Sequence, residues 1–335
     1  MFARFALAAL AMLAAVTPAA AQQNPTVKIG IYGILTEAGL FIAQERGYFT
    51  AEKVNVELVP GAAGTDVFPA FATGEVDAVG GSFSPGYVNA FRRGLNMKMT
   101  VALSSFEKTG NAGFFMIRPE LADKIKDWKD LKGYRIAVAP PRPNLNEYIV
   151  EKGLEQGGLT LKDVQVVEIP FPTMIAALKS GAVDASHTAE PLSTQAQDSG
   201  AAVKWRTTES YLPGLTPALL SFGPRLLDKD RDLAERVLAA YLRGARDYVK
   251  AFEKNEGRQD IVNILVKYTP VKNPDLYGRM GMSHIDGNGV MNVKVLQDVA
   301  DFFSQAGAIE KIDMNTLIDD SLRQAAIKRL AAEQH

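Results

Sequence analysis

The chain contains no cysteine, only three histidines and two tryptophans, and its charges nearly cancel. Without cysteine it can form no disulfide framework, no thiolate metal site and no thioether-linked lipid anchor. The histidines (His187, His284 and His335) show no metal-ligand spacing, so the sequence predicts neither a metal nor a cofactor. Its 37 basic and 38 acidic residues give a net charge of −1, and no run of Lys or Arg exceeds two residues. Nucleic acid is therefore not an expected partner.

A long apolar run occurs only at the start of the chain. Arg4 precedes it, the run extends from Phe5 to Val16, and the small residues Ala19-Ala20-Ala21 follow. This order is typical of a secretory signal peptide over residues 1–21, although an uncleaved anchor helix is the alternative. Export without a lipid or an anchor favours a bacterial periplasm, with free secretion as the alternative.

Two stretches of the chain repeat each other. The first reads Ala70-Phe71-Ala72-Thr73-Gly74-Glu75-Val76-Asp77-Ala78, and the second reads Ala177-Leu178-Lys179-Ser180-Gly181-Ala182-Val183-Asp184-Ala185. Strand-like segments precede both copies, at 27–32 and 54–59 and again at 134–139 and 164–169, with helical stretches between them. The pattern predicts an α/β protein of two lobes, each a mostly parallel sheet flanked by helices, with a ligand cleft between the lobes.

The repeat and the helical tail together predict the division of the chain. We expect a first part of lobe one at 22–117, lobe two at 118–205, and a hinge return with helical completion of lobe one at 206–335. Apolar residues from Leu233 to Tyr248 recur at helical spacing, which predicts one long amphipathic helix packed on a core.

Six loops follow the carboxyl ends of the predicted strands and should line the cleft. These cleft loops are the segments 35–39, 61–65, 81–85, 140–144, 170–173 and 187–191. Most of them open a helix, where free backbone N–H groups and the positive end of the helix dipole favour anions. The polar, glycine and aromatic residues of these loops are the candidate ligand contacts: Thr36, Glu37, Gly64, Thr65, Ser82, Phe83, Ser84, Arg142, Asn144, Thr173 and Glu190.

Three of these loops have alternative interpretations. The segment 61–65 lacks the Gly-Lys-Ser/Thr ending of a phosphate loop, so its glycines allow either close approach to a ligand or a tight turn. Ser82 and Ser84 lack the glycine pattern of a nucleophile elbow, and Pro85 removes the amide of an oxyanion hole, so the hydroxyls bind ligand or cap a helix. Glu190 could bind a ligand amine or stabilise the hinge.

Arg142 lies between two prolines, Pro141 and Pro143, just before a predicted helix start. Its guanidinium could hold a carboxylate or sulfonate with two parallel hydrogen bonds, or it could simply face solvent. If it binds ligand, replacing it should weaken binding with little effect on the folded state.

Five ordered stretches carry a resemblance to a known family. They are Gly47-Tyr48-Phe49, 54–59, 72–77, the segment 130–138, and 177–185 followed by Glu190-Pro191. In this order they resemble the periplasmic solute-binding proteins of ABC importers, in the nitrate/sulfonate/taurine and thiamine-pyrimidine-precursor group. The resemblance implies a type II periplasmic-binding-protein fold, a monomer without enzymatic activity, and as partners a small solute and a membrane permease with its ATPase.

One loop departs from that group. Where the group carries a Gly-Ser/Thr loop after the first strand of lobe two, this chain has Pro140-Pro141-Arg142-Pro143-Asn144. A side-chain cation in place of backbone amides favours a small organic anion as the ligand, either a sulfonate or a carboxylate. Aromatic residues near the predicted cleft suggest an aromatic ligand: Tyr32, Phe83 and Phe171. The alternatives are a pyrimidine-precursor binding protein, a receptor domain that senses a ligand, and an enzyme like the similar pyrimidine synthases. The last use histidine and a cysteine-rich loop, and this chain has no cysteine.

Overall fold

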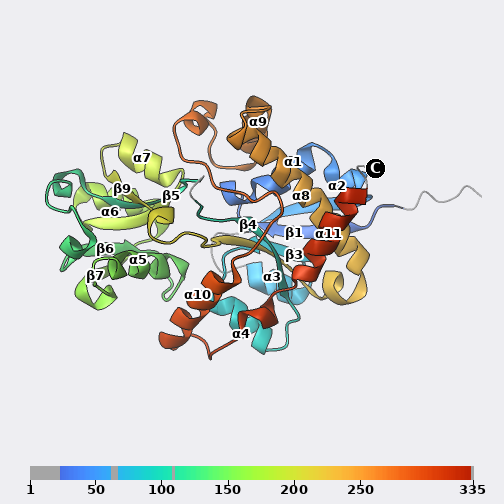
Figure 1. Cartoon of the computed structure of the whole chain (residues 1–335), viewed down its shortest axis with the longest axis horizontal. Helices are drawn as coiled ribbons and strands as arrows, with labels where there is room; N and C mark the ends of the chain where they lie inside the picture. The colour runs from blue at the N-terminus through green and yellow to red at the C-terminus, as the bar shows by residue number, and fades with distance from the viewer. Residues whose placement is uncertain (1–22, 62–66, 108–109, 333–335) are drawn as a thin grey trace, which may run out of the picture.

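The computed structural model describes residues 23–61, 67–107 and 110–332. They form two lobes, each built on a five-stranded sheet (Figure 1). The predicted leader at 1–21 lies outside the described residues. The strands are β1 (Thr26–Ile31), β2 (Asn55–Pro60), β3 (Ala78–Gly81), β4 (Lys98–Ser104), β5 (Gly113–Ile117), β6 (Arg135–Val138), β7 (Gln165–Glu168), β8 (Ala185–Ala189), β9 (Val203–Thr207) and β10 (Ala218–Phe222).

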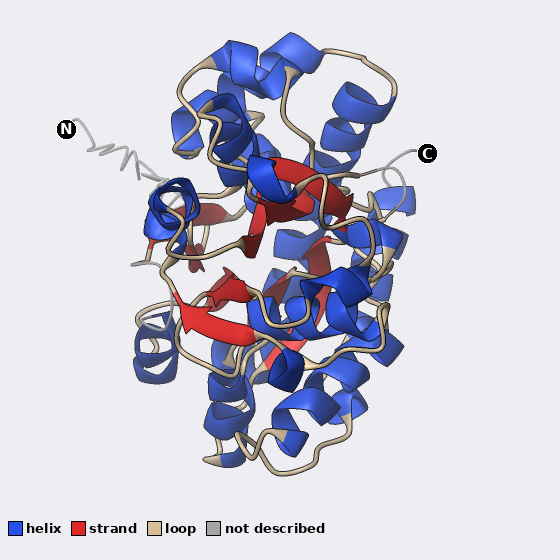
Figure 2. Cartoon of the chain, turned by 90° about the vertical axis from the view of Figure 1, so that its left-hand side faces the viewer, coloured by secondary structure: helices blue, strands red, loops and turns tan. Residues whose placement is uncertain are grey.

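Helices flank both sheets (Figure 2). The α-helices are α1 (Ala38–Glu45), α2 (Tyr48–Ala51), α3 (Val67–Thr73), α4 (Pro85–Arg92), α5 (Leu145–Glu155), α6 (Phe171–Ser180), α7 (Leu192–Asp198), α8 (Arg231–Glu253), α9 (Arg258–Tyr268), α10 (Val293–Gln305) and α11 (Asp320–Ala332). Single helical turns are η1 (Leu35–Glu37), η2 (Pro119–Leu121), η3 (Trp128–Leu131), η4 (Leu161–Asp163), η5 (Thr208–Ser210), η6 (Arg225–Lys229), η7 (Pro274–Gly278) and η8 (Met314–Leu317).

The two sheets have the same topology. Their strand orders are β2-β1-β3-β10-β4 in lobe one and β7-β6-β8-β5-β9 in lobe two. In each sheet the first three strands run parallel, while β10 and β5 run antiparallel to both of their neighbours. Each lobe therefore receives its antiparallel strand from a segment that has just crossed from the other lobe.

This exchange of strands corrects the predicted boundaries of the lobes. The first part of lobe one was predicted to end at residue 117, yet β5 pairs with β8 and β9 in the sheet of lobe two. The predicted end of lobe two, at residue 205, falls inside β9. A strand-like run shows that a strand exists, but only its hydrogen-bonding partners show which sheet it joins.

The repeated glycines end helices in the same way. Gly74 follows α3 with φ of 76°, and Gly181 follows α6 with φ of 75°. Behind them the chain closes with the same bonds, from Glu75 N to Ala70 O and from Ala182 N to Ala177 O. Glycine populates this left-handed conformation at little cost, which explains why both copies place it there.

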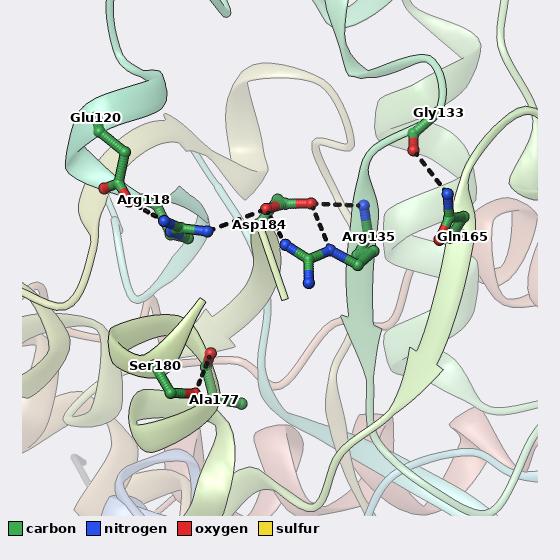
Figure 3. A network of polar contacts seen from close by, with 8 residues as sticks. All are labelled: Arg118, Glu120, Gly133, Arg135, Gln165, Ala177, Ser180 and Asp184. Atoms are coloured by element: carbon green, nitrogen blue, oxygen red, sulfur yellow. Dashed lines mark hydrogen bonds and ion pairs between the residues drawn. The ribbon is translucent and has the colours of Figure 1, made fainter. Parts of the chain in front are cut away.

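The repeated aspartates connect β3 to β1 in lobe one and β8 to β6 in lobe two. Lys28 N donates to Asp77 Oδ2 at 2.9 Å, and Arg135 N donates to Asp184 Oδ2 at 3.0 Å. An arginine after the antiparallel strand completes each site: Arg225 pairs with Asp77, and Arg118 joins Arg135 around Asp184 (Figure 3). Both aspartates lie at the amino ends of their strands, opposite the cleft edge. The sequence repeat therefore reflects residues that stabilise the two sheets.

The C-terminal helices cover lobe one and then reach lobe two. Helix α8 packs on α1 and α11, and α9 packs on α1. Helix α10 lies between the lobes (Figure 1), where Phe303 contacts Phe83 and Phe302 contacts Tyr148 of α5. None of the helices in the described ranges is long and apolar enough to cross a membrane.

Candidate ligand-binding cleft

Strand pairing shows that the carboxyl edges of the two sheets face the same crossing segments. The chain leaves β4 at Ser104 and enters β5 at Gly113, which pairs with Ala189 at the carboxyl end of β8. It returns from β9 to Ala218, which pairs with Ser104. The two crossings also bond to each other, from Phe106 N to Leu215 O and from Gly214 N to Phe106 O, both at 2.8 Å. The loops at these edges therefore border the space between the lobes.

A third segment, which we call the strap (residues 279–289), also links the lobes. Arg279 Nη1 lies 2.9 Å from Asp198 Oδ2 of α7, and Gly281 N donates to Glu190 Oε1 at 3.2 Å. Next to these contacts Ser105 N of the first crossing donates to His284 O at 3.0 Å.

The first loop of lobe one is organised around a buried carboxylate. Glu37 is 1% exposed and accepts N–H bonds from Tyr32 (2.9 Å), Gly33 (2.8 Å) and Ile34 (3.1 Å). Burial raises the pKa of Glu37 to about 7, although the three N–H donors favour its ionised form. The prediction that Glu37 contacts ligand is therefore corrected: its oxygens are used within the loop. The neighbouring Thr36 hydroxyl is buried without a partner among the described residues.

The other lobe-one candidates divide between surface and core. Ser82 is exposed and its hydroxyl donates to Pro217 O at 2.7 Å, while Ser84 occupies the N-cap position of α4 without a capping side-chain bond. Phe83 is only 1% exposed and packs between Tyr87 and Phe303, so it belongs to the core and its predicted ligand contact is corrected. Gly64 and Thr65 lie outside the described residues.

In lobe two the first loop joins Arg142 to a buried acid. Arg142 Nη2 lies 2.5 Å from Glu147 Oε1, and the Arg142 side chain is 34% exposed against 7% for Glu147. The hydrogen bond with Glu147 holds the pKa of Arg142 above its ordinary value. Arg142 is the only Lys or Arg in the six cleft loops. The prediction that replacing Arg142 has little effect on the folded state is corrected. Without the Arg142 side chain, Glu147 would be left buried and unpaired.

Asn144 and Thr173 both act at helix starts. Asn144 caps α5 by accepting from Glu147 N at 3.0 Å, and it donates to Pro141 O at 2.7 Å. Thr173 is exposed in the first turn of α6, and its hydroxyl donates to Pro170 O at 3.0 Å. The amino ends of α5 and α6 therefore lie at the cleft edge. The helix dipole gives each of these ends a partial positive charge.

The Glu190 carboxylate is buried and bonded to other parts of the protein. Its side chain is 0% exposed and contacts Lys204 Nζ at 2.7 Å, Thr194 Oγ1 at 2.9 Å and Gly281 N at 3.2 Å. Of the two roles that the sequence allows, these bonds support hinge stabilisation over ligand binding.

A buried polar network at the hinge was not predicted from the sequence. Asn146 Nδ2 donates to His187 Nδ1 at 3.1 Å, so the ring proton is assigned to Nε2, which donates to Thr208 Oγ1 at 2.8 Å. Burial lowers the pKa of His187 to about 3, which keeps the ring neutral and excludes it as an accessible base. Only the spatial pairing of α5, β8 and the second crossing reveals it, since the three residues are far apart in sequence.

A small cavity of about 10 Å³ lies beside the carboxyl end of β3. Tyr32 lies across it against Gly81, where an added Cβ would be 3.0 Å from the Tyr32 ring. A broader hollow of about 620 Å³, between α9 and η7, includes no cleft-loop residue. The described residues hold no group of three or more potential metal-ligating His, Asp or Glu side chains. The cavity is lined by Tyr32, Val79, Gly81, Ser82, Tyr87, Leu219 and Ser221.

The family model described as NMT1/THI5 like matches residues 36–253. The chain belongs to this family. Among solved structures, the aliphatic sulphonate binding protein SsuA from Escherichia coli is 19% identical, with a TM-score of 0.71 over 88% of this chain and 92% of that chain. The nitrate-binding protein NrtA from Synechocystis PCC 6803 is 16% identical, with a TM-score of 0.72 over 91% and 89%.

An enzyme shares the same architecture. A mutant of the desulfurization enzyme DszB, solved with biphenyl-2-sulfinic acid, is 15% identical to this NMT1/THI5-like protein, with a TM-score of 0.63 over 91% of this chain and 99% of that chain. No curated protein sequence matches the chain significantly. The predicted two-lobed α/β fold of the periplasmic binding proteins is thus confirmed, and these sulphonate- and nitrate-binding structures agree with the group that the sequence resembles.

Proposed function

We propose that the protein captures a small organic anion, a sulfonate or carboxylate, between its lobes and delivers it to the permease and ATPase of an ABC importer. In this proposal the protein works as a monomer in the periplasm after loss of residues 1–21, and it catalyses no reaction. Ligand affinity that differs between open and closed forms drives the cycle.

The observation that carries the proposal is the position of Arg142. It is the sole cation of the cleft loops, it remains one-third exposed, and Glu147 holds one end of its planar fork. The guanidinium has five N–H donors, so the contact at Nη2 leaves donors for a bidentate anion. The amino ends of α5 and α6 add partial positive charge at the same edge.

A catalytic function fits the residues less well. The form of DszB that was crystallised with its sulfinic acid carries serine in place of a cysteine, and this chain has no cysteine at all. His187 is buried and neutral, so it could not serve as a general base in the cleft.

A thermal-shift screen of the mature protein should identify the class of ligand, because binding to the native state raises apparent stability. The panel contains alkane- and arenesulfonates, aliphatic and aromatic carboxylates, nitrate and pyrimidines. Stabilisation by sulfonates or carboxylates supports the proposal. Stabilisation by pyrimidines alone, or turnover of a panel member, would contradict it.

Calorimetric titration then tests Arg142. Arg142→Ala alone would leave Glu147 buried without its ion-pair partner. The dissociation constant of the double variant Arg142→Ala/Glu147→Gln is therefore compared with that of Glu147→Gln. Loss of a desolvated arginine–carboxylate or arginine–sulfonate contact should weaken binding by about thirtyfold or more. Arg93→Ala, at the exposed residue that follows α4, is the control for a general change in charge. Equal dissociation constants in the compared pair would remove Arg142 from the site.

A further inference from the structure

Glu37 decides what the first loop of lobe one can offer a ligand. In α/β lobes the amides that follow a strand are the usual anion donors. Here the amides of Tyr32, Gly33 and Ile34 all donate to the Glu37 carboxylate. These three amides are therefore occupied within the protein, and no charged side chain lies among residues 32–36.

The accessible side chains of this segment include an aromatic ring and an aliphatic residue. Tyr32 is half-buried against Gly81, and Ile34 is 44% exposed. The cavity beside Tyr32 accommodates about one water, so the ring has a nearly solid support. Tyr32 and Ile34 therefore give the segment after β1 an accessible apolar surface.

Lobe two contributes a further exposed hydrophobic residue. The large hydrophobic side chains that are exposed in the described ranges are Ile34, Phe171 at 39% and Val290 at 51%. Ile34 lies between β1 and the cleft loop at 35–39 in lobe one, and Phe171 lies in a cleft loop of lobe two. Val290 lies in the loop before α10. Exposed apolar groups on both sides of a cleft lose their contact with water when a solute with an apolar body fills the space.

We propose that the solute binds in one orientation, with its charged end at Arg142 in lobe two and its apolar body against Tyr32 and Ile34 in lobe one, covered by Phe171. This inference rests on the proposed function and narrows its ligand class. The ligands are organic anions with an extended apolar body. Small inorganic oxyanions such as nitrate lack the part that lobe one recognises.

A homologous series of n-alkanesulfonates, from methanesulfonate to octanesulfonate, tests the orientation by calorimetric titration. Each methylene that enters the apolar site should tighten binding by about fourfold until the site is full. Ile34→Ser and Tyr32→Ala should each weaken octanesulfonate binding by roughly fivefold to twentyfold and leave methanesulfonate almost unchanged. Val290→Ser is the matched control and should leave the whole series unchanged.

The head group is tested in the same series. Arg142→Ala/Glu147→Gln, compared with Glu147→Gln, should weaken all members by a similar factor. Two results would overturn the inferred orientation without contradicting the capture of an anion. In the first, methanesulfonate binds as tightly as octanesulfonate; in the second, nitrate binds more tightly than octanesulfonate. A steep series that is unaffected by Ile34→Ser and Tyr32→Ala would also overturn it. Failure of every anion in the screen would remove the proposed function itself.

Discussion

Glu190 shows how a residue at the edge of the cleft can serve the fold alone. Its carboxylate is fully buried against Lys204, whose side chain is 17% exposed. Removing one member of such a pair leaves the other charge buried and uncompensated. Glu190→Ala should therefore lower the free energy of unfolding by about 3–5 kcal/mol, measured by urea denaturation. Asp123→Ala, which breaks a solvent-exposed pair with Lys126, should change the free energy of unfolding by less than about 0.5 kcal/mol.

Glu37 should make stability depend on pH. Its folded pKa is raised from 4.5 to about 7, so between these values the folded state holds a proton that the unfolded state has released. The stabilising contribution is complete below pH 4.5 and is lost as the pH rises through 7. Relative to Glu37→Gln, which cannot titrate, the native protein should lose on the order of 2–3 kcal/mol between pH 4.5 and 8. A constant difference between the two unfolding free energies across this range would contradict the assignment.

At the scale of residues, the sequence predicted loop positions better than side-chain roles. It placed Glu37, Phe83 and Glu190 in cleft loops, which they occupy, but their side chains turn inward to amides, aromatic rings and a lysine. A position in a loop follows from local pattern. The direction of a side chain depends on partners such as Phe303 and Lys204, which lie elsewhere in the chain.

Elements were predictable where the signal is local. The long helix predicted from the spacing of Leu233 to Tyr248 is α8, and the repeated glycines end α3 and α6 as their pattern suggests. The sheet of β5 was not predictable, because its hydrogen-bonding partners β8 and β9 lie about 70 to 90 residues further along the chain. Local pattern contains no information about that pairing.

The strap gives a prediction at this scale. A Cβ on Gly281 would lie 1.8 Å from Asn111 O, so the strap approaches the first crossing as closely as only glycine allows. Gly281→Ala should destabilise the protein by about 1–3 kcal/mol, because backbone must move to make room. Gly278→Ala is the matched control: nothing lies within 4 Å of its added Cβ. Equal unfolding free energies for the two variants would show that the strap adjusts without cost.

For the whole molecule, the packing of α10 bears on whether the lobes unfold together. One continuous core cluster includes Phe83 of lobe one, Phe303 of α10 and Tyr148 of lobe two. Ring contacts connect them, with centroids 5.7 Å apart for Phe83–Phe303 and 5.5 Å apart for Tyr148–Phe302. Because this apolar surface is shared, neither lobe can unfold without exposing part of the core of the other.

We therefore expect a single cooperative unfolding transition, and the tryptophans provide a selective probe of it. The only two, Trp128 and Trp205, meet edge to face inside lobe two with ring centroids 4.8 Å apart, so their fluorescence reports that lobe alone. Circular dichroism reports the helices of both lobes. Under urea the two signals should share one midpoint, since coincident transitions indicate two-state behaviour. Phe302→Ala, which removes the ring contact with Tyr148, should separate the midpoints or broaden the transition. Two midpoints in the unaltered protein would show that the lobes unfold independently despite their common core.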